Sequence, residues 1–193
     1  MDAELIRRYD RALPRYTSYP TAPHFSDAVD EAAYRAWLAR LDPALPLSLY
    51  VHVPFCDQLC LFCGCHTAVV RDEAPRRAYA DLLVCELGML TACLPGRFSL
   101  RHIHWGGGTP TALSAAALRA VHAALLDGFD LAPGAEIAFE IDPRHLPADR
   151  LAALGEIGLT RASLGVQDLH PAVQRAVGRV QDAGTTGAAA EAL

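Results

Sequence analysis

The chain has 193 residues, a formal net charge of −5 and a pI near 5.9, so it lacks the basic surface that nucleic-acid binding requires. Hydrophobic residues make up 52% of it, which is enough for a substantial core, and no apolar run approaches the length of a membrane span. All 17 basic residues are arginine, which excludes lysine-based Schiff-base or general-base chemistry. We therefore predict a globular protein that binds neither nucleic acid nor membrane.

Residues 1–46 are predicted to form an N-terminal arm followed by a helix. The arm at residues 15–23 has no regular period, and its prolines and tyrosines suit an extended strap that either packs on another surface or contacts a substrate. An apolar stripe from about Asp27 to Leu41 predicts an amphipathic helix, which Pro43 and Pro46 would end. No apolar signal segment stands at the start, so we expect a cytoplasmic protein with reduced thiols.

The rest of the chain alternates strand-like and helix-like segments four times. Short apolar runs predict strands at residues 47–53, 100–105, 135–141 and 160–166. Helices are predicted at residues 75–95, 114–126, 147–157 and 171–177, with Ser114 as an N-cap and Gly158 as a C-terminal stop. This alternation predicts an α/β fold in which parallel strands form a partial (β/α) barrel over residues 47–182. The alanine-rich tail, residues 183–193, matches none of these units.

The stretch directly after the first predicted strand holds four of the six cysteines. Cys56, Cys60 and Cys63 follow a C-x3-C-x2-C spacing, and one tight loop can turn three thiolates toward one corner of an iron-sulfur cluster. Three protein ligands leave one iron open to a small molecule. Zinc or incidental clustered thiols are alternatives, although a structural zinc site normally takes four ligands in two separated pairs. Cys85 and Cys93 lie in a predicted helix and are expected to be small buried residues.

Other candidate residues are predicted to share one edge of the sheet. The glycine run at residues 106–108, Glu140 and Gln167 each fall at or just past the carboxyl end of a strand, where barrel enzymes assemble their sites. The glycines let the backbone approach a ligand closely, although a plain turn would use the same residues. Glu140 could accept hydrogen bonds from ribose hydroxyls or an ammonium group, or it could form a structural ion pair with Arg144.

Six short segments carry a resemblance to a known family. They are residues 15–21 (RYTSYPT), 50–56 (YVHVPFC), 63–65 (CGC), 104–111 (HWGGGTPT), 140–144 (EIDPR) and 165–168 (GVQD). In this order they resemble the oxygen-independent coproporphyrinogen III oxidases, a family of radical S-adenosylmethionine (SAM) enzymes. Because members of that family are much longer, the resemblance implies the N-terminal part of a radical SAM barrel, truncated after about four βα units.

The resemblance implies that Cys56, Cys60 and Cys63 hold a 4Fe-4S cluster. An electron from the cluster would cleave SAM to a 5'-deoxyadenosyl radical, which would abstract hydrogen from the propionate side chains of coproporphyrinogen III. The implied reaction is oxygen-independent oxidative decarboxylation to protoporphyrinogen IX in haem biosynthesis. Coproporphyrinogen III, an electron donor and an electron acceptor are therefore the expected partners, and we expect a monomer for the full-length protein.

The resemblance also implies two bound SAM molecules and their contacts. The first would be bound by Tyr50, Gly107 and Glu140, and the second by Phe62, Gly108, Thr109, Gln167 and Arg179. Cys65 is expected to lie beside the site without binding the cluster, and together with the arm it separates the chain from a related haem-chaperone branch. His52 and His104 are expected to be packed, hydrogen-bonded core residues rather than metal ligands.

Three functions are open from the sequence. The first is an enzyme of tetrapyrrole synthesis, or the N-terminal part of one. The second is a haem chaperone of the related branch, which would bind haem without converting coproporphyrinogen. The third is a fragment that binds the cluster and SAM without turnover, a reading suggested by the end of the chain after the fourth predicted strand.

Overall fold

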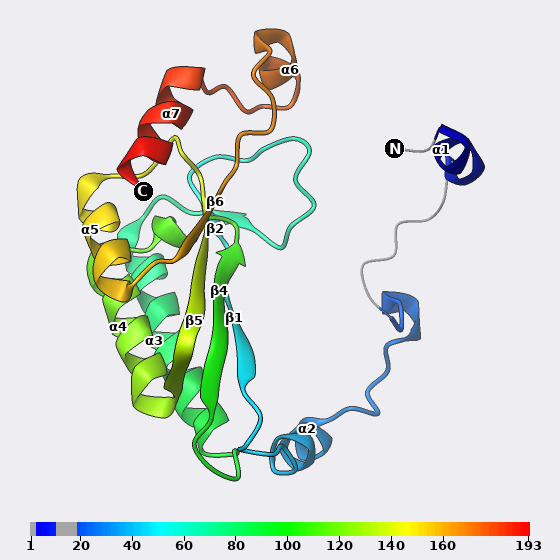
Figure 1. Cartoon of the computed structure of the whole chain (residues 1–193), viewed down its shortest axis with the longest axis vertical. Coiled ribbons are helices and arrows are strands. Elements are labelled where there is room, and N and C mark those ends of the chain that lie inside the picture. The colour runs from blue at the N-terminus through cyan, green and yellow to red at the C-terminus, as the bar shows by residue number, and fades with distance from the viewer. Residues whose placement is uncertain (1–2, 11–18) are drawn as a thin grey trace. The chain divides into compact units, whose positions relative to one another are not determined.

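The computed structural model describes residues 3–10 and 19–193, and the chain divides into two compact units, Met1–Trp37 and Leu38–Leu193 (Figure 1). Residues 11–18 of the predicted arm lie outside the described residues. The sequence-based divisions at residues 46 and 182 stay predictions. No helix in the described ranges is both long and apolar enough to cross a bilayer.

The first unit contains short helical elements. They are α1 (Ala3–Tyr9), the 3-10 turn η1 (Ala22–His24) and most of α2 (Glu31–Leu38). The predicted helix start near Asp27 is wrong, because the carboxylate of Asp30 accepts a hydrogen bond from the Ala33 N–H and caps the helix there. Tyr34 and Trp37 on α2 are exposed rather than buried within the unit.

The second unit is built on a parallel four-stranded sheet in the order β1-β4-β5-β6. Its strands are β1 (Leu47–Val53), β4 (Ser99–Gly107), β5 (Asp130–Ile141) and β6 (Arg161–Leu164). The connecting helices α3 (Glu73–Thr91), α4 (Ala115–Gly128) and α5 (Ala148–Ile157) cover the same face of the sheet (Figure 1). In a (β/α) barrel the helices likewise form only the outer layer. The predicted α/β fold with parallel crossovers is confirmed.

The helix ends follow local capping rules. Ser114 accepts a hydrogen bond from the Ala117 N–H at the start of α4, and Gly158 ends α5 with a φ of 83°, both as predicted. The strand β5 begins at Asp130 rather than at residue 135. An irregularity in its pairing with β4 covers the Pro133-Gly134 segment, and this bulge hides the first part of the strand from sequence reasoning.

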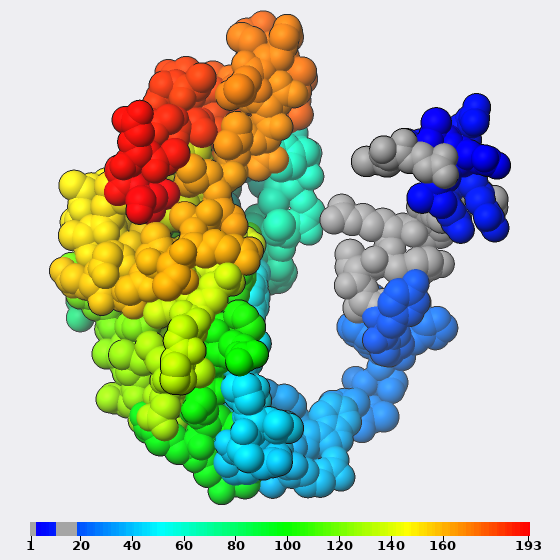
Figure 2. Space-filling model, in the orientation of Figure 1, coloured from blue at the N-terminus to red at the C-terminus, as the bar shows by residue number. Residues whose placement is uncertain are grey.

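Further elements of the second unit were not predicted from the sequence. The short strands β2 (Phe55–Cys56) and β3 (Ala68–Val69) pair in parallel at the base of the cysteine loop. After α6 (Pro171–Ala176), the alanine-rich tail forms α7 (Ala183–Ala192), which Asp182 caps by accepting a hydrogen bond from the Thr185 N–H. Figure 2 shows α7 in red on the surface of the molecule, and only Ala189 of this helix is buried.

The core lies between the sheet and the helices that cover it. Along β4, Ile103 and Trp105 are fully buried, while His102 and His104 face the other side because side chains alternate on a strand. Trp105 stacks on Phe139 of β5 with ring centroids 4.9 Å apart and planes inclined by 12°. Each large apolar side chain buried here contributes roughly 1.5–3 kcal/mol to stability. The face of the sheet away from the helices is therefore left to polar residues.

The prediction of buried cysteines on α3 is wrong for Cys85. This residue is exposed, and Cys93 is half-buried in the turn that follows the helix. The side of α3 that packs on the core instead carries four long side chains: Tyr79, Leu83, Leu87 and Leu90. Cys85 lies off this stripe, so the helix places it in solvent.

A buried histidine makes the stability of the fold depend on pH. His122 on α4 is 7% exposed, its Nδ1 has no hydrogen-bond partner among the described residues, and burial lowers its pKa from the ordinary 6.5. At pH values between the lowered pKa and 6.5, the unfolded chain binds more protons at His122 than the folded chain does. The stability that the neutral His122 allows above pH 6.5 is therefore lost as the pH falls through this range.

We expect the fall in Tm between about pH 7 and about pH 5 to be smaller in His122→Leu than in the wild type. Thermal unfolding followed by circular dichroism at several pH values measures this difference. The exposed His24, changed to leucine, serves as the control and should keep the wild-type dependence on pH. An equally steep fall in His122→Leu would contradict the prediction.

Candidate functional site

The residues predicted for cofactor binding lie at the carboxyl edge of the parallel sheet. The cysteine loop, residues 54–67, follows β1, the glycine run ends β4, Glu140 lies near the end of β5, and Gln167 follows β6. The helices α6 and α7 are at this same end (Figure 1), and the Leu61 N–H of the loop donates to the carbonyl oxygen of Val177. The predicted placement at one edge is confirmed, while the roles of these residues stay predictions.

The thiols of the loop suit an iron-sulfur cluster. Cys56, Cys60 and Cys63 are free and half-buried, and Cys65 is exposed. In the described part of the chain, no three His, Cys, Asp or Glu side chains converge closely enough to hold one metal ion. A cluster differs, because each thiolate binds a separate iron. Burial raises the pKa of the Cys56 thiol, the hydrogen bond with Thr109 opposes this rise, and the charges of Cys63 and Cys60 add to it.

Arg76 fixes the cysteine loop to the first crossover helix. Its side chain leaves α3, is 7% exposed, and donates to the carbonyl oxygens of Val70 and Ala112, each at 2.9 Å. It also forms an ion pair with Asp57 of the loop. Since Ala112 belongs to the turn η2 (Pro110–Ala112), one guanidinium joins the cysteine loop to the segment after the glycine run.

Arg76→Gln is expected to lower the free energy of unfolding by about 1.5–3 kcal/mol, because the buried acceptors lose a charged donor. Urea denaturation measures the change. Arg77→Gln, an exposed change of the same kind on the same helix, should stay within about 0.5 kcal/mol of the wild type. Equal losses in the two variants would mean that the contacts of Arg76 contribute nothing specific.

The glycine run packs directly against the cysteine loop. Gly107 has a φ of 115°, and a Cβ there would lie 2.7 Å from the carbonyl oxygen of Val53. A Cβ at Gly108 would lie 2.6 Å from the carbonyl oxygen of Phe55 and 2.8 Å from the sulfur of Cys56. Only glycine fits such an approach without a shift of the backbone. The next residue, Thr109, is 8% exposed, and its hydroxyl lies 3.9 Å from the same sulfur.

A polar group on the sheet face away from the helices contains the three residues predicted for the first SAM. The carboxylate of Glu140 accepts a hydrogen bond from the Gly107 N–H at 3.3 Å and lies 3.1 Å from Nε2 of His104. The ring of Tyr50 stacks on His104, with centroids 5.7 Å apart and an interplanar angle of 18°. Partial burial, and then the charge of Glu140, raise the pKa of Tyr50, so its phenol stays neutral.

The alternative ion pair between Glu140 and Arg144 is not formed. Arg144 instead pairs with Asp142, because the Asp-Pro-Arg turn after β5 brings its guanidinium and its own N–H back onto that carboxylate. His52 and His104 are hydrogen-bonded as predicted, but they are only half-buried and lie outside the core, so their prediction as core residues is wrong. Because the partner of His104 is Glu140, this histidine belongs to the site.

The residues predicted for the second SAM are spread more widely. Gly108 and Thr109 contact the sulfur of Cys56, whereas Phe62 on the loop and Gln167 after β6 are exposed. Gln167 has a φ of 64°, an uncommon conformation for a residue other than glycine that is often found at functional sites.

Arg179 differs from these exposed residues. It is 8% exposed and donates to the sulfur of Cys60, the carbonyl oxygen of Gly165 and the side chain of Gln181. Its contact with Cys60 brings the segment after α6 onto the cysteine loop.

Sequence reasoning missed the buried charges around Asp142. This residue is 8% exposed and forms ion pairs with Arg144 at 2.6 Å and Arg179 at 3.1 Å. Burial by itself would raise the pKa of Asp142, but hydrogen bonds and charge from the two arginines outweigh it and hold the pKa below its usual range. The available signal was a charged turn, Asp-Pro-Arg, directly after an apolar strand.

The family model of the radical SAM superfamily matches residues 50–192, so the chain belongs to this superfamily. It is 49% identical over 178 residues to the oxygen-independent coproporphyrinogen III oxidase of Paracoccus denitrificans, covering 92% of this chain and 40% of that protein. It is 46% identical to the protein of the same name from Bradyrhizobium diazoefficiens, covering 100% of this chain and 43% of the relative.

A solved structure shows the same similarity in three dimensions. Coproporphyrinogen III oxidase from Escherichia coli, described as a radical SAM enzyme, superposes with a TM-score of 0.86 at 40% sequence identity. The match covers 99% of this chain and 42% of the other. The predicted resemblance is confirmed over nearly the whole chain, and the chain spans about two-fifths of the length of these relatives.

Proposed function

We propose that Cys56, Cys60 and Cys63 hold a 4Fe-4S cluster and that the chain cleaves SAM reductively as the radical-generating part of an oxygen-independent coproporphyrinogen III oxidase. The packing of the glycine run on the cysteine loop carries this proposal. With Gly108 against the sulfur of Cys56, the backbone of the glycine run lies directly beside the loop that would hold the cluster. When bound, the cluster supplies the electron and SAM supplies the bond that it cleaves.

Glu140 is the residue best placed to orient the first SAM. Its carboxylate has about four lone-pair positions, and contacts with Gly107 and His104 leave others free for an ammonium or ribose hydroxyl group. The imidazole of His104 holds the carboxylate in place, and the ring of Tyr50 holds the imidazole by stacking. These four residues come from three neighbouring strands, β1, β4 and β5.

The relatives named above supply the proposed substrate. Their names state an action on coproporphyrinogen III, and we extend that substrate, with its need for an electron donor and acceptor, to the protein represented by this chain. The second SAM is proposed to contact the remaining predicted residues: Phe62, Gly108, Thr109, Gln167 and Arg179. A second candidate function is SAM cleavage without turnover of the porphyrinogen, because the residues described above are proposed to contact the cluster and SAM alone.

Anaerobic reconstitution with iron and sulfide tests the proposal. After reduction, we expect an electron paramagnetic resonance (EPR) signal that changes when SAM is added, together with 5'-deoxyadenosine in the same tube. Added coproporphyrinogen III distinguishes the two candidate functions. Formation of protoporphyrinogen IX supports the complete reaction, and 5'-deoxyadenosine without protoporphyrinogen IX supports SAM cleavage without turnover. No cluster, or a cluster whose signal is indifferent to SAM, would refute both.

Glu140→Gln separates SAM binding from cluster binding in that experiment. The amide keeps the shape but loses the charge, so we expect an unchanged iron content and a SAM-induced EPR change reduced at least severalfold. Glu136→Gln is the matched control, because Glu136 lies four positions before Glu140 on the same strand and pairs with Arg161. An equal response to SAM in both variants would remove Glu140 from the site.

A further inference from the structure

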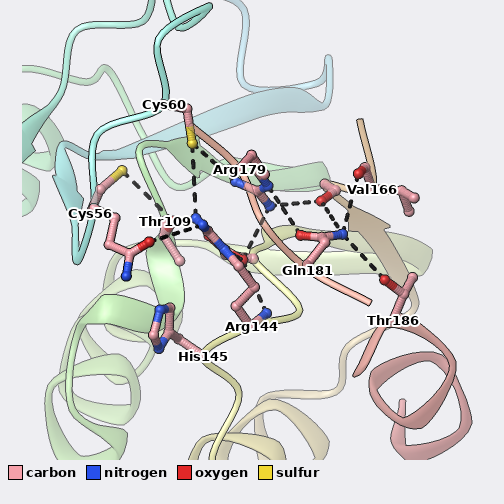
Figure 3. Close-up of polar contacts among 12 residues, drawn as sticks. Cys56, Cys60, Thr109, Arg144, His145, Val166, Arg179, Gln181 and Thr186 are labelled. Atoms are coloured by element: carbon pink, nitrogen blue, oxygen red, sulfur yellow. Dashed lines mark hydrogen bonds and ion pairs between the residues drawn. The ribbon is translucent and has the colours of Figure 1, made fainter. Parts of the chain in front are cut away.

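A buried group of charges lies against a single cysteine of the loop. The guanidinium of Arg179 donates to the sulfur of Cys60 at 3.6 Å, and that of Arg144 donates to the same sulfur at 3.9 Å. Figure 3 shows both groups pointing toward Cys60 from different segments of the chain. Between them lies the carboxylate of Asp142, which is paired with each. All three charged side chains are 9% exposed.

Both guanidiniums are held by further bonds. Arg144 donates to the side-chain oxygen of Gln58 at 3.1 Å, within the cysteine loop. Arg179 donates to the carbonyl oxygen of Gly165 at 2.7 Å and to Gln181 at 3.2 Å. A planar guanidinium with several fixed partners presents its remaining donor in a defined direction. The two cations are therefore set in position rather than attracted loosely to the sulfur.

The arrangement distinguishes one ligand from the others. In the described part of the chain, guanidinium donors reach only Cys60 among the three predicted cluster ligands, whereas Cys56 has a threonine hydroxyl 3.9 Å away. Two arginines and one aspartate leave a net positive charge of one beside that sulfur. Such a charge, buried away from water, acts strongly on its neighbours.

We propose that Asp142 is a positioning residue that holds Arg144 and Arg179 on the sulfur of Cys60, and that the two cations make the bound cluster easier to reduce. Reduction adds a negative charge to the cluster, and hydrogen bonds to the sulfurs and nearby charge set its potential. This inference rests on the proposed function, because it requires the cluster. It adds a role for two residues, Asp142 and Arg144, that lie outside the predicted ligand set.

Redox titration of the reconstituted 193-residue chain, followed by EPR, tests the inference. In Arg144→Gln we expect a midpoint potential more negative than in the wild type. At a fixed potential, the ratio of reduced to oxidised cluster should be about tenfold lower, and for a one-electron couple this corresponds to a shift of ~59 mV. Arg161→Gln is the matched control, because it removes the same charge at the amino end of β6. It should titrate like the wild type.

Asp142→Asn separates positioning from simple charge. If the arginines stayed in place, loss of the carboxylate would make the cluster easier to reduce. We expect the opposite, a more negative potential, because the guanidiniums lose the partner that holds them on Cys60. A more positive potential in Asp142→Asn, or a wild-type potential in Arg144→Gln, would overturn the proposal.

Arg144→Lys covers the case in which Arg144→Gln assembles too little cluster for titration. Lysine keeps the charge but cannot bridge the carboxylate and the sulfur with a planar fork, so a smaller negative shift is expected. If Arg144→Gln assembles too little cluster, the sign of the shift in Asp142→Asn decides, and a more positive potential there would overturn the proposal. If the wild-type chain itself holds no cluster, the proposed function fails first, so the two failures are distinguishable.

Discussion

Changing Cys60 to alanine is expected to abolish binding of the iron-sulfur cluster and, with it, the cleavage of SAM. Each of the three predicted ligands binds a separate iron, and the open iron needed for SAM leaves no spare protein ligand to replace a lost thiolate. Cys56→Ala and Cys63→Ala should have the same effect. Iron and sulfide analysis after anaerobic reconstitution, with the EPR spectrum of the reduced sample, measures the loss.

Two other cysteines provide controls for that experiment. Cys85→Ala changes an exposed thiol on α3, away from the cysteine loop, and should leave the iron content unchanged. Cys65→Ala should also retain iron, because Cys65 is predicted to lie beside the site without binding the cluster. A Cys60→Ala variant with wild-type iron content would contradict the ligand assignment. Loss of iron in Cys65→Ala would make that residue a ligand.

Gly108→Ala is expected to reduce stability and cluster binding together. The added methyl group would lie 2.6 Å from a backbone oxygen of Phe55 and 2.8 Å from the sulfur of Cys56, so the loop or the end of β4 must move. Overpacking of this kind typically costs about 1–3 kcal/mol. Because the displaced atoms belong to a predicted cluster ligand, we expect iron content to fall more than stability alone would explain.

Gly155→Ala is the matched control for Gly108→Ala. Gly155 lies within α5 and a Cβ there would meet no atom within 4 Å, so alanine should stabilise the helix by roughly 0.5–1 kcal/mol. Urea denaturation gives the two free energies of unfolding, and iron analysis gives the cluster content. Unchanged stability and iron content in Gly108→Ala would show that the glycine run does not press on the cysteine loop.

Local pattern predicted the architecture but not every element. Runs of apolar residues and helical periods predicted the four parallel strands and their helices, because both signals depend only on neighbouring residues. The pair β2 and β3 was missed, since strands of two residues carry no period. The helix α7 was missed because its alanines give no apolar stripe to read.

The candidate site was predicted in its parts rather than in its connections. The cysteine spacing, the glycine run and Glu140 all stand out in the sequence, and their common edge follows from the parallel topology. The contact of Glu140 with His104, the pairing of Arg144 with Asp142 and the anchoring by Arg76 do not stand out. Each of these depends on the direction in which a long side chain turns.

The sequence by itself determined the fold class, the order of the strands along the chain and the loop that supplies the thiols, because period and spacing are local properties. Only the tertiary structure decided which polar groups meet. His104 and Glu140 are 36 positions apart, and Arg179 and Cys60 are 119 positions apart. Such partners meet only after strands and helices have packed, since the core sets the distance and direction of each side chain.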